Sequence, residues 1–223
     1  MLTSLDGPRM PPAAGGRPTS LVILLHGYGS NGADLISLAP YWAKALPNTQ
    51  FVSPNAPEPV PMAPGGYQWF PVSRLDPREM DLGVTRAAGT LSKFIDRELE
   101  RYQIAPAKLA LVGFSQGTMM ALHVGLRREG VGGIVGFSGA LAAPGKLKEE
   151  ARGKPPILLV HGDQDDMIPV TALFDAADGL AAAGLGAQWH ISYGVPHSIG
   201  PDGLALGGDF LKAALLGKLR ALS

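Results

Sequence analysis

The chain has 223 residues, enough to bury a sizeable core in one domain, and its composition is ordinary for a globular protein, with 46% hydrophobic and 17% charged residues. Its 19 basic and 19 acidic residues give a formal net charge of zero, so charge supplies no reason to expect a nucleic acid or an anionic membrane as partner. The absence of cysteine excludes disulfides, a thiol nucleophile and cysteine metal sites. The first residues lack the pattern of a secretory signal, and the apolar runs are too short to span a bilayer, which predicts a cytoplasmic protein.

Residues 1–18 form a Gly/Pro-rich lead-in, which we expect to be either a turn between marginal edge strands or a loose arm. Strand-like apolar runs then alternate with helix-like stretches. The predicted strands are 21–25, 51–53, 109–113, 133–137, 157–161 and 188–193, and the predicted helices are 34–45, 81–102, 115–130, 170–183 and 204–220. Several strands are apolar at nearly every position, which is typical of strands buried on both faces. The alternation predicts a single α/β domain with a mostly parallel central sheet and helices on both faces.

The segment 54–77 interrupts this alternation with a long proline-rich loop that has no periodicity. Loops of this length inside a compact domain are often functional. It carries three aromatic residues, Tyr67, Trp69 and Phe70. We expect these rings either to fill a cluster beneath the loop or to line a substrate cleft, and both can hold.

The pentapeptide GFSQG places Ser115 between an apolar run and a helix-like stretch. A serine at such a strand-to-helix turn is held in a strained conformation, with its hydroxyl exposed above a helix N-terminus. The turn requires small residues two positions to either side, and both are glycine. Ser138 also follows a strand-like run, but proline and glycine come soon after it, so we expect a tight turn there.

A serine nucleophile needs a histidine base and a carboxylate that orients the base, and in open parallel sheets such groups gather at the carboxyl ends of strands. Where the serine lies on a strand-to-helix turn of this kind, the chain order is Ser, then Asp or Glu, then His. Among the five histidines, His197 follows a strand-like run in a Gly-Val-Pro turn and is the predicted base. His190 lies within that run and is tethered to the sheet. The acid is expected in the loop HGDQDDMIP, where chain order alone does not choose among Asp163, Asp165 and Asp166.

The negative charge of a tetrahedral intermediate needs waiting N–H donors. One is the backbone N–H of Gln116, directly after the nucleophile. The second is expected from the HGYG loop after the first long strand, where the glycines allow close backbone approach, and Tyr28 is the candidate. Together these residues predict an enzyme with a serine nucleophile, and the scattered histidines, with no H-E-x-x-H pattern, do not suggest a zinc site.

The motifs LLHGYGSNGADL, PNAP, QWF, GFSQG, HGDQDDMIP and VPHSIG, over residues 20–217, resemble in kind and order those of the phospholipase/carboxylesterase family of α/β-hydrolases. The resemblance implies Asp165 as the catalytic acid, Ser115 as nucleophile and His197 as base, with Tyr28 and Gln116 in the oxyanion hole. It also implies hydrolysis of carboxylic esters or thioesters without a cofactor.

The chain departs from the thioesterase members of that family at Asp166, where they usually have proline, and at Pro71, where they usually have aspartate. These departures favour the bacterial carboxylesterase branch. The function expected is therefore a serine carboxylesterase acting on a small-molecule ester. The alternatives are a thioesterase or lysophospholipase for long acyl chains and, from another class, a non-catalytic binding module on a hydrolase fold. A homodimer is possible on this sequence, and residues 54–77 are a candidate lid.

Overall fold

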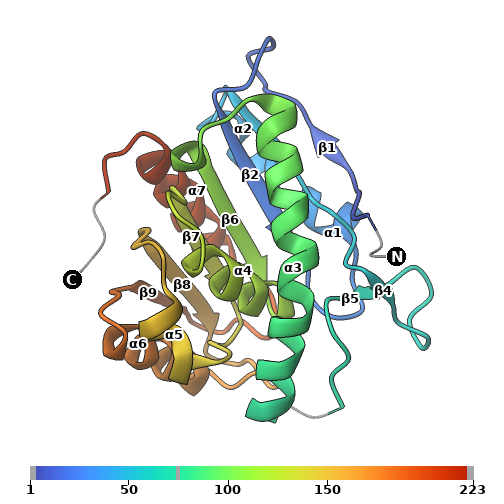
Figure 1. Ribbon diagram of the computed structural model, residues 1–223, viewed down its shortest axis with the longest axis vertical. Coiled ribbons are helices and arrows are strands. Elements are labelled where there is room, and N and C mark those ends of the chain that lie inside the picture. Colours follow the sequence, from blue (N-terminus) through green and yellow to red (C-terminus); the bar gives the residue numbers. More distant parts are fainter. Residues whose placement is uncertain (1–3, 74–75, 220–223) are drawn as a thin grey trace.

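A seven-stranded sheet forms the centre of the protein in the computed structural model, which describes residues 4–73 and 76–219 (Figure 1). Its strand order is β1-β3-β2-β6-β7-β8-β9, with β1 antiparallel to β3 and every other neighbouring pair parallel. The strands are β1 (Arg9–Met10), β2 (Ser20–Leu25), β3 (Thr49–Val52), β6 (Leu109–Phe114), β7 (Gly133–Phe137), β8 (Ile157–Gly162) and β9 (Gln188–Ser192). The predicted α/β fold with a mostly parallel sheet is confirmed.

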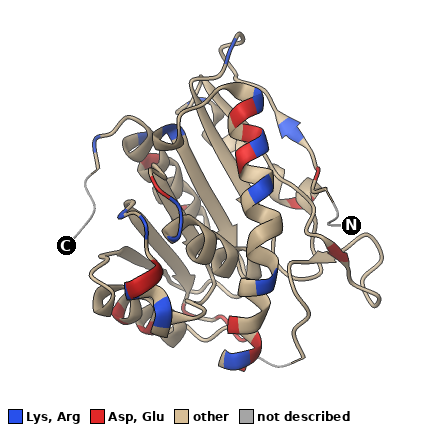
Figure 2. Cartoon of the chain, in the orientation of Figure 1, with Lys and Arg blue, Asp and Glu red and all other residues tan. Residues whose placement is uncertain are grey.

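Two helical layers cover the sheet and explain why its central strands are apolar on both faces. One layer contains α3 (Pro77–Tyr102), α4 (Gln116–Leu126), α5 (Leu147–Glu150) and α6 (Thr171–Ala182), whose apolar residues share a core with one face of the strands. The other layer contains α1 (Gly32–Ile36), α2 (Ala39–Ala43) and α7 (Pro201–Leu215), packed on the opposite face. The parallel strands carry no Lys, Arg, Asp or Glu; among the described residues these lie on helices, loops and short antiparallel strands such as β1 (Figure 2). Two short 3-10 helices, η1 (Pro106–Lys108) and η2 (Pro144–Lys146), connect these elements.

The predicted helix over 34–45 is two short helices instead of one. Asn31 caps α1, its side chain accepting from the backbone N–H of Asp34 at 3.0 Å. Pro40 then lies at the start of α2, where its missing N–H is tolerated. Inside one continuous helix the same proline would remove a hydrogen bond and clash with the preceding turn. The break therefore follows from Pro40.

The segment 54–77 contains a small hairpin of β4 (Glu58–Pro59) and β5 (Tyr67–Gln68). The hairpin docks on the loop after β2, because Tyr67 N–H donates to Ser30 O at 2.7 Å and Gly29 N–H donates to Tyr67 O at 2.9 Å. The part of this segment at positions 74 and 75 lies outside the described residues. The HGYG loop, which carries the candidate oxyanion donor Tyr28, is therefore hydrogen-bonded to the proline-rich loop.

The lead-in 1–18 contributes the marginal edge strand β1, with positions 1–3 outside the described residues. Arg9 of β1 reaches Glu98 of α3, with Nη2 and Oε1 2.9 Å apart. Glu98 is fully buried, so the guanidinium supplies the partner that a buried carboxylate requires. This contact ties the start of the chain to the long helix.

Within the part of the chain that the structure describes, no helix is both long and apolar enough to cross a membrane.

Candidate active site

The strand-to-helix turn at Ser115 has the backbone geometry that the sequence predicts. Ser115 has φ 54° and ψ −118°, a conformation that costs about 1–3 kcal/mol for a residue with a side chain. Its N–H donates to Phe137 O at 2.9 Å, which fixes the turn to the neighbouring strand β7. Ser115 directly follows β6 and precedes α4, so the positive end of the helix dipole lies beneath its hydroxyl.

The two glycines of the pentapeptide are required by close backbone contacts. A Cβ atom at Gly113 would lie 2.4 Å from the carbonyl carbon of Gly117. A Cβ atom at Gly117 would lie 1.8 Å from the carbonyl oxygen of Leu25, at the end of β2. Real Cβ atoms do not approach so closely, so larger residues would push α4 away from the sheet. The small residues therefore allow the helix to begin directly behind the serine.

His197 and Asp165 form a hydrogen-bonded pair, with Nδ1 and Oδ2 2.8 Å apart. His197 lies in the loop between β9 and α7, and its ring packs against Phe114 with the ring centroids 4.9 Å apart. A carboxylate can only accept, so Nδ1 carries the proton and Nε2 is left as the basic nitrogen. The pair has the polarity that a general base requires.

The environment of Asp165 keeps it ionised. Burial raises the pKa of its carboxyl, but the hydrogen bond from His197, with the backbone N–H of Ile168 and of Met167, outweighs burial and lowers the pKa below its usual value. These two N–H groups donate to Oδ1 at 2.8 Å and 3.0 Å. Within the described residues, the other two candidate acids, Asp163 and Asp166, make no hydrogen bond or ion pair with His197. Asp163 accepts from the N–H of Gly194 at 2.6 Å instead.

His161 supports this carboxylate, a role that the sequence did not indicate. Its Nε2 lies 2.8 Å from Ile168 O and 3.3 Å from Asp165 Oδ2. A carbonyl only accepts, so Nε2 carries a proton directed at both oxygens. The four-residue spacing between His161 and Asp165 was the available signal, but its meaning depends on a turn that periodicity does not predict.

The two candidate oxyanion donors lie at the pocket that contains Ser115. Tyr28 follows β2 and Gln116 begins α4, and both line that pocket together with Ser115 and His197. Within the described residues, neither backbone N–H donates a hydrogen bond. The first N–H groups of a helix have no partner inside the helix, so that of Gln116 is free for a ligand.

The side chain of Gln116 performs a second task that the sequence did not reveal. Its Oε1 accepts from the N–H of Trp69 at 2.8 Å, and its Nε2 donates to the carbonyl oxygen of Phe70 at 2.8 Å. The indole N–H of Trp69 in turn donates to His26 O at 2.9 Å. These bonds join the nucleophile turn, the proline-rich loop and the HGYG loop into one buried network.

The aromatic residues of the loop mostly fill a cluster beneath it. Trp69 and Phe70 are each only 1% exposed and belong to the core of the α3–α4 layer. Phe70 lies against Gly83 of α3, where a Cβ atom would come within 2.2 Å of its ring. Tyr67 is half-buried and packs against the same core. Among the described residues, none of these three lines the pocket around Ser115, and the loop contributes Val72 and Ser73 there instead.

The remaining histidines and the second serine lie in other environments. His190 pairs with Asp202, Nε2 to Oδ2 at 2.7 Å, and so is engaged away from Asp165. His26 is buried, which lowers its pKa, and its Nε2 accepts from the N–H of Ala56 at 2.9 Å. Burial, followed by the charge of Arg127, lowers the pKa of His123 to about 4. Ser138 is buried, so its hydroxyl is not accessible to a substrate.

The pocket at Ser115 has a volume of about 260 Å³. It is lined by Tyr28, Val72, Ser73, Met80, Ser115, Gln116, Met119, Met167, Ile168 and His197. Ser115 Oγ makes no hydrogen bond to His197 among the described residues, a bond that is often long in a free enzyme and tightens with substrate. No group of three or more His, Asp or Glu side chains in the described ranges is arranged to hold a metal ion.

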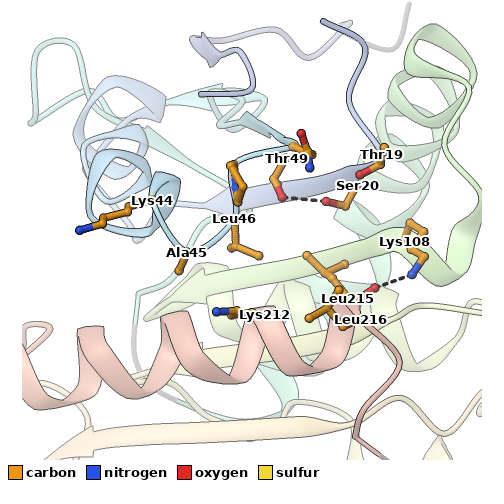
Figure 3. A pocket seen from close by; sticks show the side chains of 12 residues that line it. Thr19, Ser20, Lys44, Ala45, Leu46, Thr49, Lys108, Lys212, Leu215 and Leu216 are labelled. Carbon is orange, nitrogen blue, oxygen red and sulfur yellow. Dashed lines mark hydrogen bonds between the residues drawn. The ribbon is translucent and has the colours of Figure 1, made fainter. Parts of the chain in front are cut away.

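A larger depression of about 500 Å³ lies at the opposite edge of the sheet (Figure 3). Its walls include Ser20 and Thr49, the first residues of β2 and β3, whose hydroxyl oxygens are 2.7 Å apart. Lys108 there donates from Nζ to Leu215 O at 2.5 Å. The carboxyl ends of the parallel strands, where functional groups gather in such sheets, lie at the opposite end of the strands, on the side of Ser115. The smaller pocket is therefore the candidate active site.

Known proteins resemble this chain in sequence and in fold. The model of the phospholipase/carboxylesterase family matches residues 12–215. Acyl-protein thioesterase 1 of Saccharomyces cerevisiae is 32% identical over 212 residues, covering 87% of this chain and 92% of that protein. Esterase YpfH of Escherichia coli is 26% identical over 193 residues, covering 86% and 82%. The crystal structure of esterase PE8 has a TM-score of 0.90 and 43% identity, covering 95% of this chain and 100% of that one. The chain therefore belongs to the phospholipase/carboxylesterase family of α/β-hydrolases, and it is a serine hydrolase that acts on ester bonds.

Proposed function

We propose that the protein is a carboxylesterase that hydrolyses small-molecule esters through Ser115, His197 and Asp165 and an acyl-enzyme intermediate. The observation that carries the proposal is the convergence of three features on one pocket. The strained turn presents Ser115, and the Asp165-bound imidazole of His197 lies at the same pocket. Tyr28 and Gln116 also line it, and their backbone N–H groups donate no hydrogen bond within the described residues. No cofactor is needed for this chemistry.

In the first step, Ser115 Oγ bonds to the ester carbonyl carbon while its proton passes to Nε2 of His197. The electron pair of the carbonyl bond moves onto oxygen, and the N–H groups of Tyr28 and Gln116 receive that negative charge. The bond to the alcohol oxygen then breaks. Nε2 gives its proton to the departing alcohol, which leaves an acyl-serine and a neutral imidazole.

In the second step, water takes the place of the alcohol. Its proton passes to Nε2, its oxygen bonds to the acyl carbon, and the same two N–H groups hold the oxyanion. Collapse of this intermediate returns the proton to Ser115 Oγ and releases the carboxylic acid. Asp165 remains ionised throughout, which agrees with its lowered pKa, and it stabilises the imidazolium that forms in each step.

The test compares two serine variants. Ser115→Ala should lower kcat for 4-nitrophenyl acetate by roughly 10⁴–10⁶-fold and abolish labelling by a fluorophosphonate probe. Ser138→Ala is the matched control, a second serine directly after a strand, and should keep both activity and labelling. Near-normal turnover by folded Ser115→Ala would remove this residue from the mechanism, and an unlabelled wild-type protein would favour a binding module.

A thioesterase is the second candidate, because several relatives, including the protein of Saccharomyces cerevisiae, bear the name acyl-protein thioesterase. The same triad would attack a thioester by the same steps. Parallel kcat/KM measurements on an oxyester and a thioester with the same acyl group separate the two functions. The cytoplasmic location and a possible homodimer stay predictions.

A further inference from the structure

The pocket at Ser115 and a second, larger depression share three lining residues within the described part of the chain. We call the second depression the outer hollow; its volume is about 490 Å³. Met80, Met119 and Ile168 line both spaces and so form a partition between them. The other residues that line the outer hollow are mainly apolar, among them Ala140, Leu141, Pro144, Pro169, Ala172 and Ala176, and its polar members are Asp81, Thr171 and Asp175.

The partition closes the buried end of the pocket. Met119 is 2% exposed and Ile168 5%, whereas Met167, which lines the same pocket, is 62% exposed. Because the proton passes between His197 and the alcohol or water, both exchange beside His197. An acyl group that extends from Ser115 towards the buried Met119 and Ile168 would meet these side chains, and they would then limit its length.

The size of the pocket agrees with this limit. Its 260 Å³ lies below the ~300–1,000 Å³ typical of sites that enclose drug-sized ligands. Part of that space must hold the carbonyl group and the leaving alcohol. Little room then remains for an acyl chain on this side of the partition.

The three side chains of the partition differ in how firmly they are held. Ile168 is fixed by its backbone, which donates to Asp165 Oδ1 and accepts from His161. Met119 lies in the first turn of α4 and is packed into the core. Met80, in the first turn of α3, is half-buried and packs only at the border of the core. Met80 is therefore the member whose truncation opens the partition with least damage.

We propose that Met80, Met119 and Ile168 set the acyl-length limit of this site, so that its substrates are esters of short-chain carboxylic acids. The outer hollow becomes an acyl site once Met80 is truncated. The proposal rests on the esterase function proposed above. Each methylene of the acyl chain that is buried against apolar side chains should raise kcat/KM about fourfold. A methylene that collides with the partition should bring no such increase.

The experiment measures kcat/KM along two ester series. The first varies the acyl group from acetate to laurate on a constant 4-nitrophenol. The second varies the alcohol on a constant acetate. For the wild-type protein we expect kcat/KM to rise only over the shortest acyl chains and to fall by at least about tenfold from its maximum to decanoate. A wild-type series that keeps rising to decanoate would overturn the proposal without any variant.

Met80→Ala should raise the ratio of kcat/KM for decanoate to that for acetate by at least about tenfold. Adding Ala172→Phe, which fills the outer hollow, should reverse most of this gain. Met62→Ala is the matched control, because Met62 is 92% exposed and does not line the pocket, and it should leave the ratio unchanged. If Met80→Ala folds poorly, Met80→Val tests the same opening.

Two outcomes for the variants would overturn the proposal: an unchanged acyl-length ratio in folded Met80→Ala, or a gain confined to the alcohol series. A wild-type protein that hydrolyses no ester in either series would instead refute the proposed esterase function. The failure of the partition and the failure of the enzyme are thus separate results.

Discussion

The buried amide of Gln116 allows a stability prediction whose size follows from its hydrogen bonds. Replacing Gln116 by methionine keeps the length of the side chain and the backbone N–H but removes both polar groups. The N–H of Trp69 and the carbonyl oxygen of Phe70, each held at 2.8 Å, then lose their partners in a buried environment. Each unsatisfied group costs about 1–3 kcal/mol, so Gln116→Met should lower the free energy of unfolding by roughly 2–6 kcal/mol.

Urea unfolding followed by circular dichroism measures this change, with the slope of the transition as a check on two-state behaviour. A chain of this size loses about 2–4 °C in Tm per kcal/mol, so the loss should also be evident in thermal scans. Gln188→Met is the control, because Gln188 is exposed on the edge strand β9, and it should change stability by no more than about 0.5 kcal/mol. A loss for Gln116→Met as small as that of Gln188→Met would refute the structural role of the amide.

Two further predictions concern the histidines. In an ester assay, His197→Ala should lower kcat to nearly the level of Ser115→Ala. His190→Ala should keep its activity within about tenfold of wild type, because His190 is hydrogen-bonded to Asp202. Comparable losses in the two folded variants would contradict the choice of His197 as base. His123 is neutral when folded, with a pKa of about 4 against an unfolded value of 6.5, so between these pH values the unfolded chain binds more protons. The contribution of neutral His123 to the free energy of unfolding is fully present above about pH 6.5. It is lost as the pH falls towards about 4, by up to about 3 kcal/mol. In urea titrations at several pH values, His123→Leu should lose less stability than wild type across this range, and parallel curves would rule out the effect.

The parallel strands could be predicted because burial on both faces leaves a sequence signal. Runs such as 109–112 and 157–160 are apolar throughout, and the structure places both inside the sheet, with a neighbouring strand on either side. The two-residue strands β1, β4 and β5 carry no such signal, since a period of two residues cannot be recognised in two positions. They exist only because a neighbouring backbone offers hydrogen-bonding partners.

The candidate site was predictable where its chemistry constrains residue type and order. Ser115 needs its glycines, and in hydrolases with this strand-to-helix turn the base follows the acid along the chain, so Ser115 and His197 were identifiable from the residues alone. The choice of Asp165 over Asp163 and Asp166 came from resemblance, because it depends on which carboxylate the turn after β8 directs at the imidazole.

The tasks of Gln116, Trp69 and His161 depend on contacts between distant segments. Gln116 and Trp69 lie 47 positions apart, and their hydrogen bond exists only once the proline-rich loop has docked. An aromatic residue in such a loop can face a substrate or the core, and the sequence pattern is the same in both cases. The indole N–H of Trp69 donates to His26 O, and this hydrogen bond holds the ring in the core.

The same contacts indicate how firmly Ser115 and His197 are each held at the candidate site. The Ser115 turn is held by three neighbours: Ser115 N–H bonds to Phe137 O, the Gln116 amide holds the loop, and Gly117 packs against Leu25 O. Its strained backbone therefore cannot relax. His197 is held by one hydrogen bond to Asp165 and one ring contact, on a loop. The hydrogen bond between hydroxyl and imidazole that the proposed mechanism requires can therefore form by rotation of the Ser115 side chain and adjustment of the imidazole, while the backbone of the Ser115 turn keeps its position.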